Sequence, residues 1–165
     1  MYFRPILPQD REPLAALLRR IENFIPEEID VAIELIDEAI LRPELSGYRC
    51  VVALETKGEE DVPAGYICFG RTPMTERTYD LYWIAVDQTF RGKGIGVKLL
   101  RAMDEVCLQA SEGRAIIRVE TSSKESYRGT LQFYLNDGFE IAGRIPQFYR
   151  DDDDLYIIYK ALGPK

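Results

Sequence analysis

The chain has 165 residues, of which 46% are hydrophobic and 30% are charged, a composition typical of one folded domain. Its formal net charge of −7 argues against a nucleic-acid partner, because nucleic acids are bound by neutralising their phosphates. No apolar run approaches the roughly 20 residues of a membrane span, and residues 1–5 lack the apolar segment of a signal peptide. We therefore expect a cytoplasmic protein with no membrane partner.

The N-terminal part is predicted to contain one strand and two helices. Residues 2–6 are expected to form the strand, and Asp10 stands where it can cap the first helix. Apolar residues at helical spacing support this helix, namely Leu14, Leu17, Leu18 and Ile21. The second helix is expected to begin near Pro26 and to end before Pro43 and Gly47. Its apolar face comprises Ile29, Ile33, Ile36 and Ile40.

The remaining chain alternates between predicted strands and helices. Runs of apolar and β-branched residues predict strands over 48–55, 63–73, 79–86, 115–121, 139–145 and 155–162. Helical spacing appears over 97–110 and over 126–136, where Gly138 ends the segment. Polar turns are expected at 57–61 and 150–154. This order predicts an α/β sandwich with a mixed sheet.

The most informative segment is a glycine-rich stretch between a predicted strand and a predicted helix. We call it the glycine loop, with the sequence Arg91-Gly92-Lys93-Gly94-Ile95-Gly96. Glycines let a ligand approach the main chain, and free N–H groups at a helix start favour negative charge. The loop is therefore predicted to bind a phosphate or pyrophosphate. Its G-x-G-x-G spacing differs from the dinucleotide fingerprint G-x-G-x-x-G and from the P-loop G-x-x-x-x-G-K-[ST].

Two motifs resemble the GNAT N-acetyltransferase superfamily. Arg91, Gly94 and Gly96 match the pattern [RQ]-x-x-G-x-[GA] of its acetyl-CoA site, and the segment from Tyr134 to Phe139 is similar to its Y-x-x-x-G-F signature. The predicted element order matches that fold from end to end. The resemblance implies one GNAT domain over residues 1–165, with a central mixed six- to seven-stranded sheet flanked by four helices.

The resemblance also implies acetyl-CoA as co-substrate and assigns residues to it. The main chain from Arg91 to Gly96 would hold the pyrophosphate, and a main-chain N–H of Ile84 or Val86 would face the thioester carbonyl at a strand bulge. Many relatives carry an asparagine that contacts the pantetheine arm seven positions before the signature tyrosine, where this chain has Tyr127. Thr130 or Ser126 is a candidate replacement.

The resemblance to this superfamily also suggests which groups transfer protons. Tyr134 occupies the position of the general acid, while packing beside Phe133 and Phe139 is the alternative role for this side chain. With no histidine in the chain, the base must be another group. Asp80 aligns with the glutamate base of the superfamily's histone acetyltransferases, and Glu120 is its rival. Two alternatives are left open: Asp80 caps a turn, or a carboxylate or Tyr82 takes the proton through a water molecule.

The surroundings of the cysteines and the absence of histidine limit which reactions the chain can catalyse. Cys50, Cys68 and Cys107 lie in apolar runs, which predicts reduced core residues and disfavours an acetyl-cysteine intermediate. The absence of histidine excludes His-dependent triads and most zinc sites, so no metal is expected. Direct attack of a primary amine in a ternary complex is the expected route.

The acceptor is not identified by any motif. Residues 22–38 contain seven carboxylates and no lysine or arginine, so this segment could attract a cationic amine. A solvated helix face is the simpler interpretation. The carboxylates are Glu22, Glu27, Glu28, Asp30, Glu34, Asp37 and Glu38. The run of aspartates over 151–154 is expected to be a solvated turn. We expect a small-molecule amine in preference to a protein lysine or N-terminus, and leave open a homodimer. The contrasting hypothesis is a non-catalytic acyl-CoA-binding module.

Overall fold

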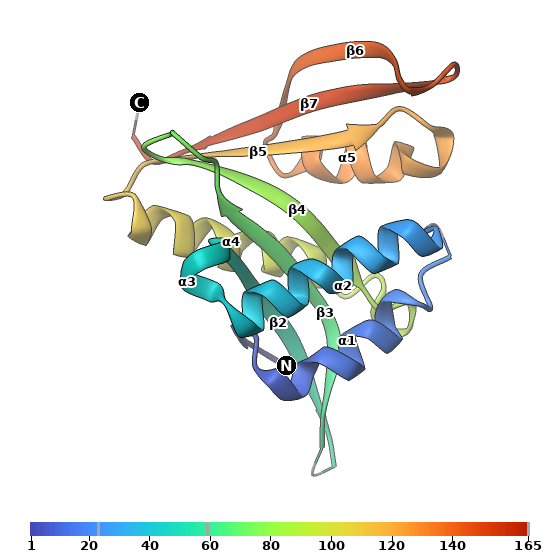
Figure 1. Cartoon of the computed structure of the whole chain (residues 1–165), viewed down its shortest axis with the longest axis vertical. Helices are drawn as coiled ribbons and strands as arrows, with labels where there is room; N and C mark the ends of the chain where they lie inside the picture. The colour runs from blue at the N-terminus through green and yellow to red at the C-terminus, as the bar shows by residue number, and fades with distance from the viewer. Residues whose placement is uncertain (23, 59, 165) are drawn as a thin grey trace. The chain divides into compact units, whose positions relative to one another are not determined.

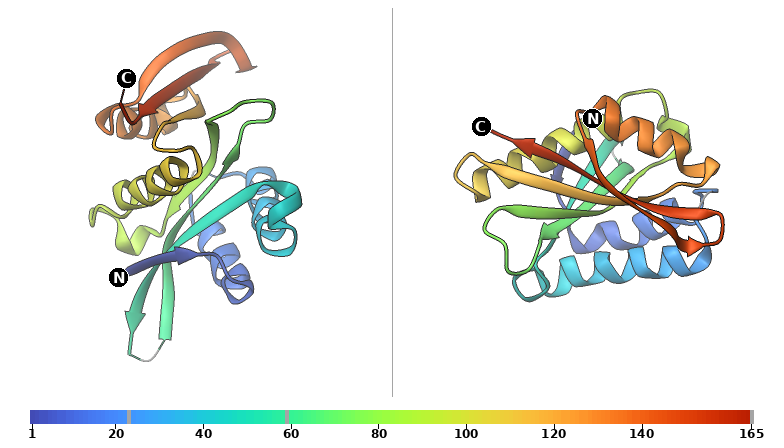
Figure 2. Two further views of the ribbon diagram at one scale, coloured as in Figure 1. Left: turned by 90° about the vertical axis from the view of Figure 1, so that its left-hand side faces the viewer. Right: turned by 90° about the horizontal axis from the view of Figure 1, so that it is seen from above.

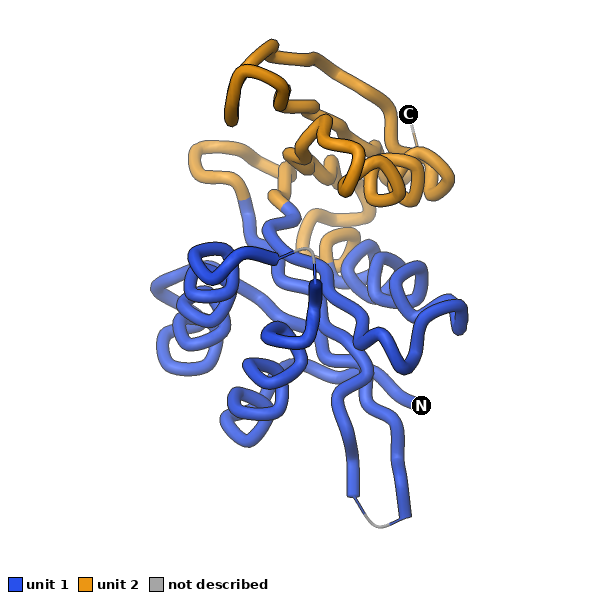
Figure 3. The backbone as a smooth tube through the Cα atoms, turned by 90° about the vertical axis from the view of Figure 1, so that its right-hand side faces the viewer, with its two compact units in different colours: residues 1–71, 81–106 blue, residues 72–80, 107–165 orange. Residues whose placement is uncertain are grey.

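The computed structural model describes residues 1–22, 24–58 and 60–164, so position 59 of the predicted turn at 57–61 lies outside the described residues. The chain divides into two compact units (Figure 3). Unit 1 contains Met1–Arg71 and Leu81–Val106, and unit 2 contains Thr72–Asp80 and Cys107–Lys165. The prediction of one domain over residues 1–165 stays a prediction. Among the helices in the described residues, none has the length and apolarity of a bilayer span.

The strands form a mixed seven-stranded sheet in the order β1-β2-β3-β4-β5-β7-β6. Their bounds are β1 Tyr2–Pro5, β2 Tyr48–Lys57, β3 Glu60–Arg71, β4 Thr78–Val86, β5 Ala115–Ser122, β6 Glu140–Arg150 and β7 Asp153–Leu162. The predicted α/β fold class is confirmed. The described residues contain five α-helices, one more than predicted, because the four-residue α3 (Pro43–Ser46) follows the second long helix.

In unit 1, β1, β2 and β3 pair antiparallel, and two helices cover one face of these strands (Figure 1). The helices are α1 (Arg11–Leu18) and α2 (Pro26–Leu41). Pro26 occupies the first turn of α2, where its missing N–H costs nothing. The core between the helices and the strands contains Leu14, Leu17, Leu18, Ile36, Val52, Leu54 and Tyr66, among others. The predicted apolar stripes of both helices therefore face this core.

One predicted cap is wrong. Asp10 precedes α1, but its side chain makes no capping hydrogen bond to that helix. Instead the carboxylate accepts hydrogen bonds from the Leu7 main-chain N–H at 2.7 Å and from the Arg4 guanidinium at 2.6 and 2.8 Å. The charged partner from β1 outcompetes the helix N–H groups, because a bidentate guanidinium bond is stronger than a neutral one. Asp10 thus fixes the short 3-10 turn η1 (Pro8–Asp10) to β1.

In unit 2, β5 runs parallel to the start of β4, whereas β5, β7 and β6 pair antiparallel. Helix α5 (Arg128–Asn136) lies along one face of these strands (Figure 2). Gly138 has φ of 88°, so the predicted left-handed end of this helix is confirmed. Strand β6 extends five residues past its predicted end at 145.

The prediction of a solvated turn at 151–154 is only half right. Asp151 and Asp152 are exposed, whereas Asp153 and Asp154 are buried at the start of β7. Asp153 accepts a hydrogen bond from the Ser122 hydroxyl, and Asp154 accepts from Arg144 and from the Gln147 N–H. These bonds satisfy the two carboxylates, and they allow an aspartate pair to begin a strand.

Candidate functional site

The glycine loop lies in unit 1, where it follows a 3-10 turn, η2 (Gln88–Phe90), and runs into the start of helix α4 (Ile95–Ala110). Gly92 has φ of 77° and Gly94 has φ of 69°, values in the left-handed region that other residues rarely adopt. An added Cβ atom would meet nothing within 4 Å at either position. The two glycines are therefore required by the backbone conformation, and the space beside them is open.

The first turn of α4 presents main-chain donors at this loop. The Lys98 N–H makes a 3.2 Å hydrogen bond to the Gly94 carbonyl oxygen, closing the first helical turn. The N–H groups of Ile95, Gly96 and Val97 precede that bond and have no intrahelical acceptor by helix geometry. Together with the positive end of the helix dipole they form a cradle whose donors and charge suit an anion. Helix α4 begins two residues earlier than predicted, so Ile95 and Gly96 belong to the helix itself.

A buried aspartate that the sequence reasoning missed holds the start of the loop. Asp87 accepts hydrogen bonds from the Thr89 N–H at 2.9 Å and the Thr89 hydroxyl at 2.7 Å, and it pairs with Arg20. Its own N–H donates to the Ala64 carbonyl at 2.9 Å. Burial opposes ionisation, but the bonds from Arg20 and Thr89 outweigh it and lower the pKa of Asp87 below its ordinary value. Asp87 thereby ties η2 to β3.

Two lysines lie against one aromatic ring beside the loop. The Lys93 ammonium is 4.9 Å from the centroid of the buried Phe90 ring, and the Lys57 ammonium is 5.1 Å from it. Cation–π attraction holds such groups near the ring face. Lys57 ends β2, far from the loop in sequence, so only the folded chain brings its charge here. This positive pair suits an anionic ligand in the cradle.

Strand β4 comes unusually close to β3 just before the loop. A Cβ atom on Gly65 would lie 2.6 Å from the Ala85 carbonyl oxygen and 3.2 Å from the Val86 Cα atom. Glycine inside a strand often marks a bulge or a close backbone approach, and here it permits the approach. Because a trans peptide directs its N–H away from its C=O, the Val86 N–H points away from Gly65.

In unit 2, the two candidate bases are joined by one arginine. Asp80 is 8% exposed and accepts hydrogen bonds from Arg118 Nε at 2.6 Å and from the Thr72 hydroxyl at 2.8 Å. Arg118 also donates from a terminal nitrogen to Glu120 at 3.3 Å. The Glu120 side chain is 43% exposed. The structure thus places both predicted carboxylates on one guanidinium and puts Asp80 within a strand rather than in a turn-capping position.

Tyr134 is buried in unit 2, on α5. Its ring packs 5.3 Å from the ring of Phe133 and 5.2 Å from that of Phe139. Burial raises the pKa of Tyr134 well above its ordinary value, so the hydroxyl keeps its proton at neutral pH. Thr130 lies one turn before it on the same helix, and Tyr127 is the residue that precedes the helix. Two of these three predicted residues therefore belong to α5, and the third adjoins its first turn.

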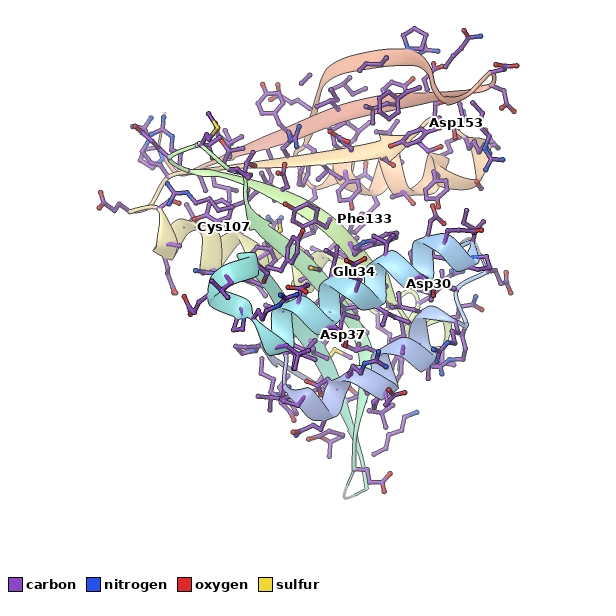
Figure 4. The ribbon with its side chains drawn as sticks, viewed as in Figure 1. Asp30, Glu34, Asp37, Cys107, Phe133 and Asp153 are labelled. Carbon is purple, nitrogen blue, oxygen red and sulfur yellow. The ribbon has the colours of Figure 1, made fainter. Side chains whose placement is uncertain are left out.

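The remaining predicted groups are the carboxylates of α2, Tyr82 and the three cysteine thiols. On α2, Asp37 is paired with Arg11 and Glu38 with Arg42, whereas Asp30 and Glu34 are exposed (Figure 4). Tyr82 of β4 packs edge-on against Tyr48, with centroids 5.2 Å apart. Cys50, Cys68 and Cys107 are buried free thiols, as predicted. The hydrogen bond between the Cys68 and Cys50 thiols, together with burial, raises the pKa of Cys68 well above its usual range.

Residues 46–141 match the acetyltransferase (GNAT) domain family. This match covers more than half of the chain, which therefore belongs to the GNAT acetyltransferase family. A solved structure from Desulfovibrio desulfuricans, assigned to the GNAT family as an acetyltransferase, is 38% identical with a TM-score of 0.89. That similarity covers 96% of this chain and 97% of the other. The resemblance inferred from the two motifs is confirmed.

Two further relatives carry more specific descriptions. An aminoglycoside 6′-N-acetyltransferase complexed with coenzyme A is 18% identical, and the match covers 100% of this chain and 99% of the other chain. Its TM-score of 0.75 shows a shared fold. N-alpha-acetyltransferase RimI of Mycobacterium tuberculosis is 32% identical over 61% of this chain and 58% of its own length. The chain spans 38% and 58% of the length of the two curated relatives it matches.

Proposed function

We propose that this chain transfers an acetyl group from acetyl-CoA to a primary amine of a small molecule by direct attack in a ternary complex. The observation that carries the proposal is the glycine loop, whose left-handed glycines and free helix N–H groups suit a pyrophosphate. Lys57 and Lys93 add positive charge beside it. Family membership and a relative complexed with coenzyme A support acetyl-CoA as the ligand.

The reaction forms one C–N bond and breaks one C–S bond. The amine nitrogen attacks the thioester carbonyl carbon, whose oxygen gains negative charge and needs a hydrogen-bond donor. The Val86 main-chain N–H, directed away from Gly65, is our candidate for that donor. Ile84, the other residue suggested by the resemblance, is half-buried on the same strand. Collapse of the addition product expels the CoA sulfur as a thiolate.

The leaving thiolate takes a proton from Tyr134 in this proposal. Burial keeps the Tyr134 phenol protonated at neutral pH, so it holds the proton that a general acid must donate. The proton lost by the amine goes to a carboxylate, Asp80 or Glu120. The chain contains no histidine that could take either role.

Direct attack is favoured over an acetyl-cysteine intermediate by the state of the thiols. A nucleophilic cysteine must reach its thiolate form and be accessible. Cys50, Cys68 and Cys107 are 4%, 0% and 0% exposed, and the pKa of Cys68 is raised. None of the three therefore has the properties of an acyl carrier.

A protein N-terminus is the second candidate acceptor. The observation that favours it is the 32% identity with RimI, described as an N-alpha-acetyltransferase. A small-molecule acceptor and a protein acceptor both present a primary amine, so the same catalytic groups serve either.

Thiol release from acetyl-CoA tests the proposal. The protein should release CoA only when an amine is present, and small cationic amines should exceed short peptides with free N-termini in kcat/KM. Faster reaction with the peptides would select the second candidate. If the protein binds acetyl-CoA but releases no CoA with either small amines or peptides, it is a non-catalytic acyl-CoA-binding module and not an enzyme.

A further inference from the structure

Asp80 and Arg118 lie directly opposite each other in the parallel pair formed by β4 and β5. Residues that are paired across neighbouring strands share one face of a sheet. Along β5 the alternate residues Ala115, Ile117, Val119 and Thr121 are buried, whereas Arg118 is half-buried and Glu120 exposed. The face that carries Asp80, Arg118 and Glu120 is therefore the less covered face of this strand pair.

The two carboxylates on this face differ in how many of their oxygen atoms are engaged. Both oxygens of Asp80 accept short hydrogen bonds, one from Arg118 at 2.6 Å and one from Thr72 at 2.8 Å. Glu120 receives one longer bond from Arg118, at 3.3 Å. Only 11% of the Asp80 side chain is accessible, against 43% for Glu120. Glu120 is thus better able to take a proton from an incoming group.

Other polar groups near Arg118 come from β7 and β6. Tyr159 pairs with Arg118 on one side and with Glu140 on the other, and its hydroxyl donates to Glu140 at 3.2 Å. This hydrogen bond raises the pKa of Tyr159. Glu120 faces Ile157 on β7, an apolar neighbour. The groups that face the arginine thus include Asp80, Glu120 and Tyr159, with Glu140 beyond the tyrosine.

We infer that Arg118 is a positioning residue: it is fixed by Asp80 and holds Glu120 as the carboxylate that accepts the amine proton. This inference rests on the proposed function and assigns different roles to the two candidate bases. The Nε atom of Arg118 is committed to Asp80, which orients the planar guanidinium toward Glu120. As the C–N bond forms, one N–H proton of the attacking amine passes to Glu120 and then to solvent.

Four variants separate these roles in an assay at saturating acetyl-CoA. Glu120→Gln should lower kcat about 10²-fold or more, because proton acceptance is lost. Arg118→Ala should lower kcat about 10-fold to 10²-fold and shift the acidic limb of the pH–rate profile to higher pH, since no cation then favours the ionised base. Arg118→Lys should restore the position of that limb and only part of kcat. Arg114→Ala, an exposed arginine just before β5, should behave as the parent.

Asp80→Asn adds the decisive comparison. If Asp80 only fixes Arg118, this variant should resemble Arg118→Lys and keep an acidic limb in its profile. Loss of that limb in Asp80→Asn, with full activity in Glu120→Gln, would overturn the inference and make Asp80 the base. An Arg118→Ala variant with unchanged kcat and pH profile would also overturn it.

A failure of the proposed function has a different outcome. No thiol release from the parent protein with any amine would overturn the acetyltransferase proposal and this inference together. The arginine Nε–H NMR signal tests the ion pair without substrate: it should shift in Asp80→Asn and stay in place in Glu120→Gln. If the signal does not move in Asp80→Asn, the inference about Arg118 is overturned, whereas the proposed function is unaffected.

Discussion

A Cβ atom on Gly65 of β3 would lie 2.6 Å from the carbonyl oxygen of Ala85 on β4. Real Cβ atoms do not approach a backbone oxygen so closely, so any other residue at position 65 must push the two strands apart. The peptide that would move is the one whose N–H we propose as the donor to the thioester carbonyl. The close approach of two strand backbones thus connects core packing to the proposed chemistry.

Gly65→Ala should therefore impair both stability and turnover. We expect a loss of about 1–3 kcal/mol in the free energy of unfolding, typical of overpacking, and a lower kcat. Chemical denaturation and thiol release measure the two effects. Gly143→Ala is the control for stability, because a Cβ there meets nothing within 4 Å. Equal stability of both variants would contradict the close approach.

The glycine loop yields a second prediction. Gly94→Val should weaken acetyl-CoA binding at least tenfold in calorimetry, since its side chain enters the space beside the cradle and its φ of 69° is strained. Gly47→Val is the matched control: φ is 70° there and the surroundings are equally open. It should lose similar stability but no affinity. Gly94→Asn tolerates the left-handed backbone, so a loss of affinity without a loss of stability would isolate the ligand contact.

The buried phenol predicts a specific kinetic pattern. Tyr134→Phe should reduce kcat about 10²-fold and leave acetyl-CoA affinity nearly unchanged, because the proton is needed only as the thiolate departs. Since burial raises the pKa of Tyr134, its proton should cause no alkaline loss of kcat at mildly basic pH. Phe133→Leu, which changes a neighbouring ring, tests packing alone. Equal kcat for parent and Tyr134→Phe, at a rate limited by chemistry, would reduce Tyr134 to a core residue.

Asp87 makes a prediction about acid stability. Its pKa is lowered in the folded chain, so its contribution is present above the unfolded-state value of about 3.9 and is lost as pH falls through the folded value. Asp87→Asn should lose about 1–3 kcal/mol at neutral pH and show a shallower decline in melting temperature below pH 4. Asp152→Asn, at an exposed site, should keep the parent profile. A parallel acid decline in Asp87→Asn and parent would contradict the assignment.

Local patterns in the sequence predicted the element order and the loop between β4 and α4. They predicted the ends of some strands incorrectly, because tertiary contacts there override the intrinsic propensity of the residues. The last but one strand was predicted to end at 145, but β6 continues through Pro146, because it is an edge strand of the sheet, where proline is tolerated. The strand propensity of Asp153 and Asp154 is low, yet Ser122 and Arg144 satisfy their carboxylates.

The candidate site was predictable only where its residues are close in sequence. The motifs gave the loop and Tyr134. The bond between Arg118 and Asp80 joins residues 38 positions apart, and that between Arg20 and Asp87 joins residues 67 apart. Such pairs depend on which strands become neighbours, which no local pattern specifies. Lys57 was missed for the same reason, since only folding brings it to Phe90.

The proposed function depends on acetyl transfer to an amine without a covalent enzyme intermediate. The most direct test is a single-turnover reaction with acetyl-CoA labelled with ¹³C in the acetyl group, followed by mass spectrometry of the small-molecule amine and of the intact protein. With direct attack, the label should appear on the amine nitrogen and never on the protein, at any time point. Label on Cys50, Cys68 or Cys107 before it reaches the amine, or label that stays on CoA with every amine offered, would contradict it.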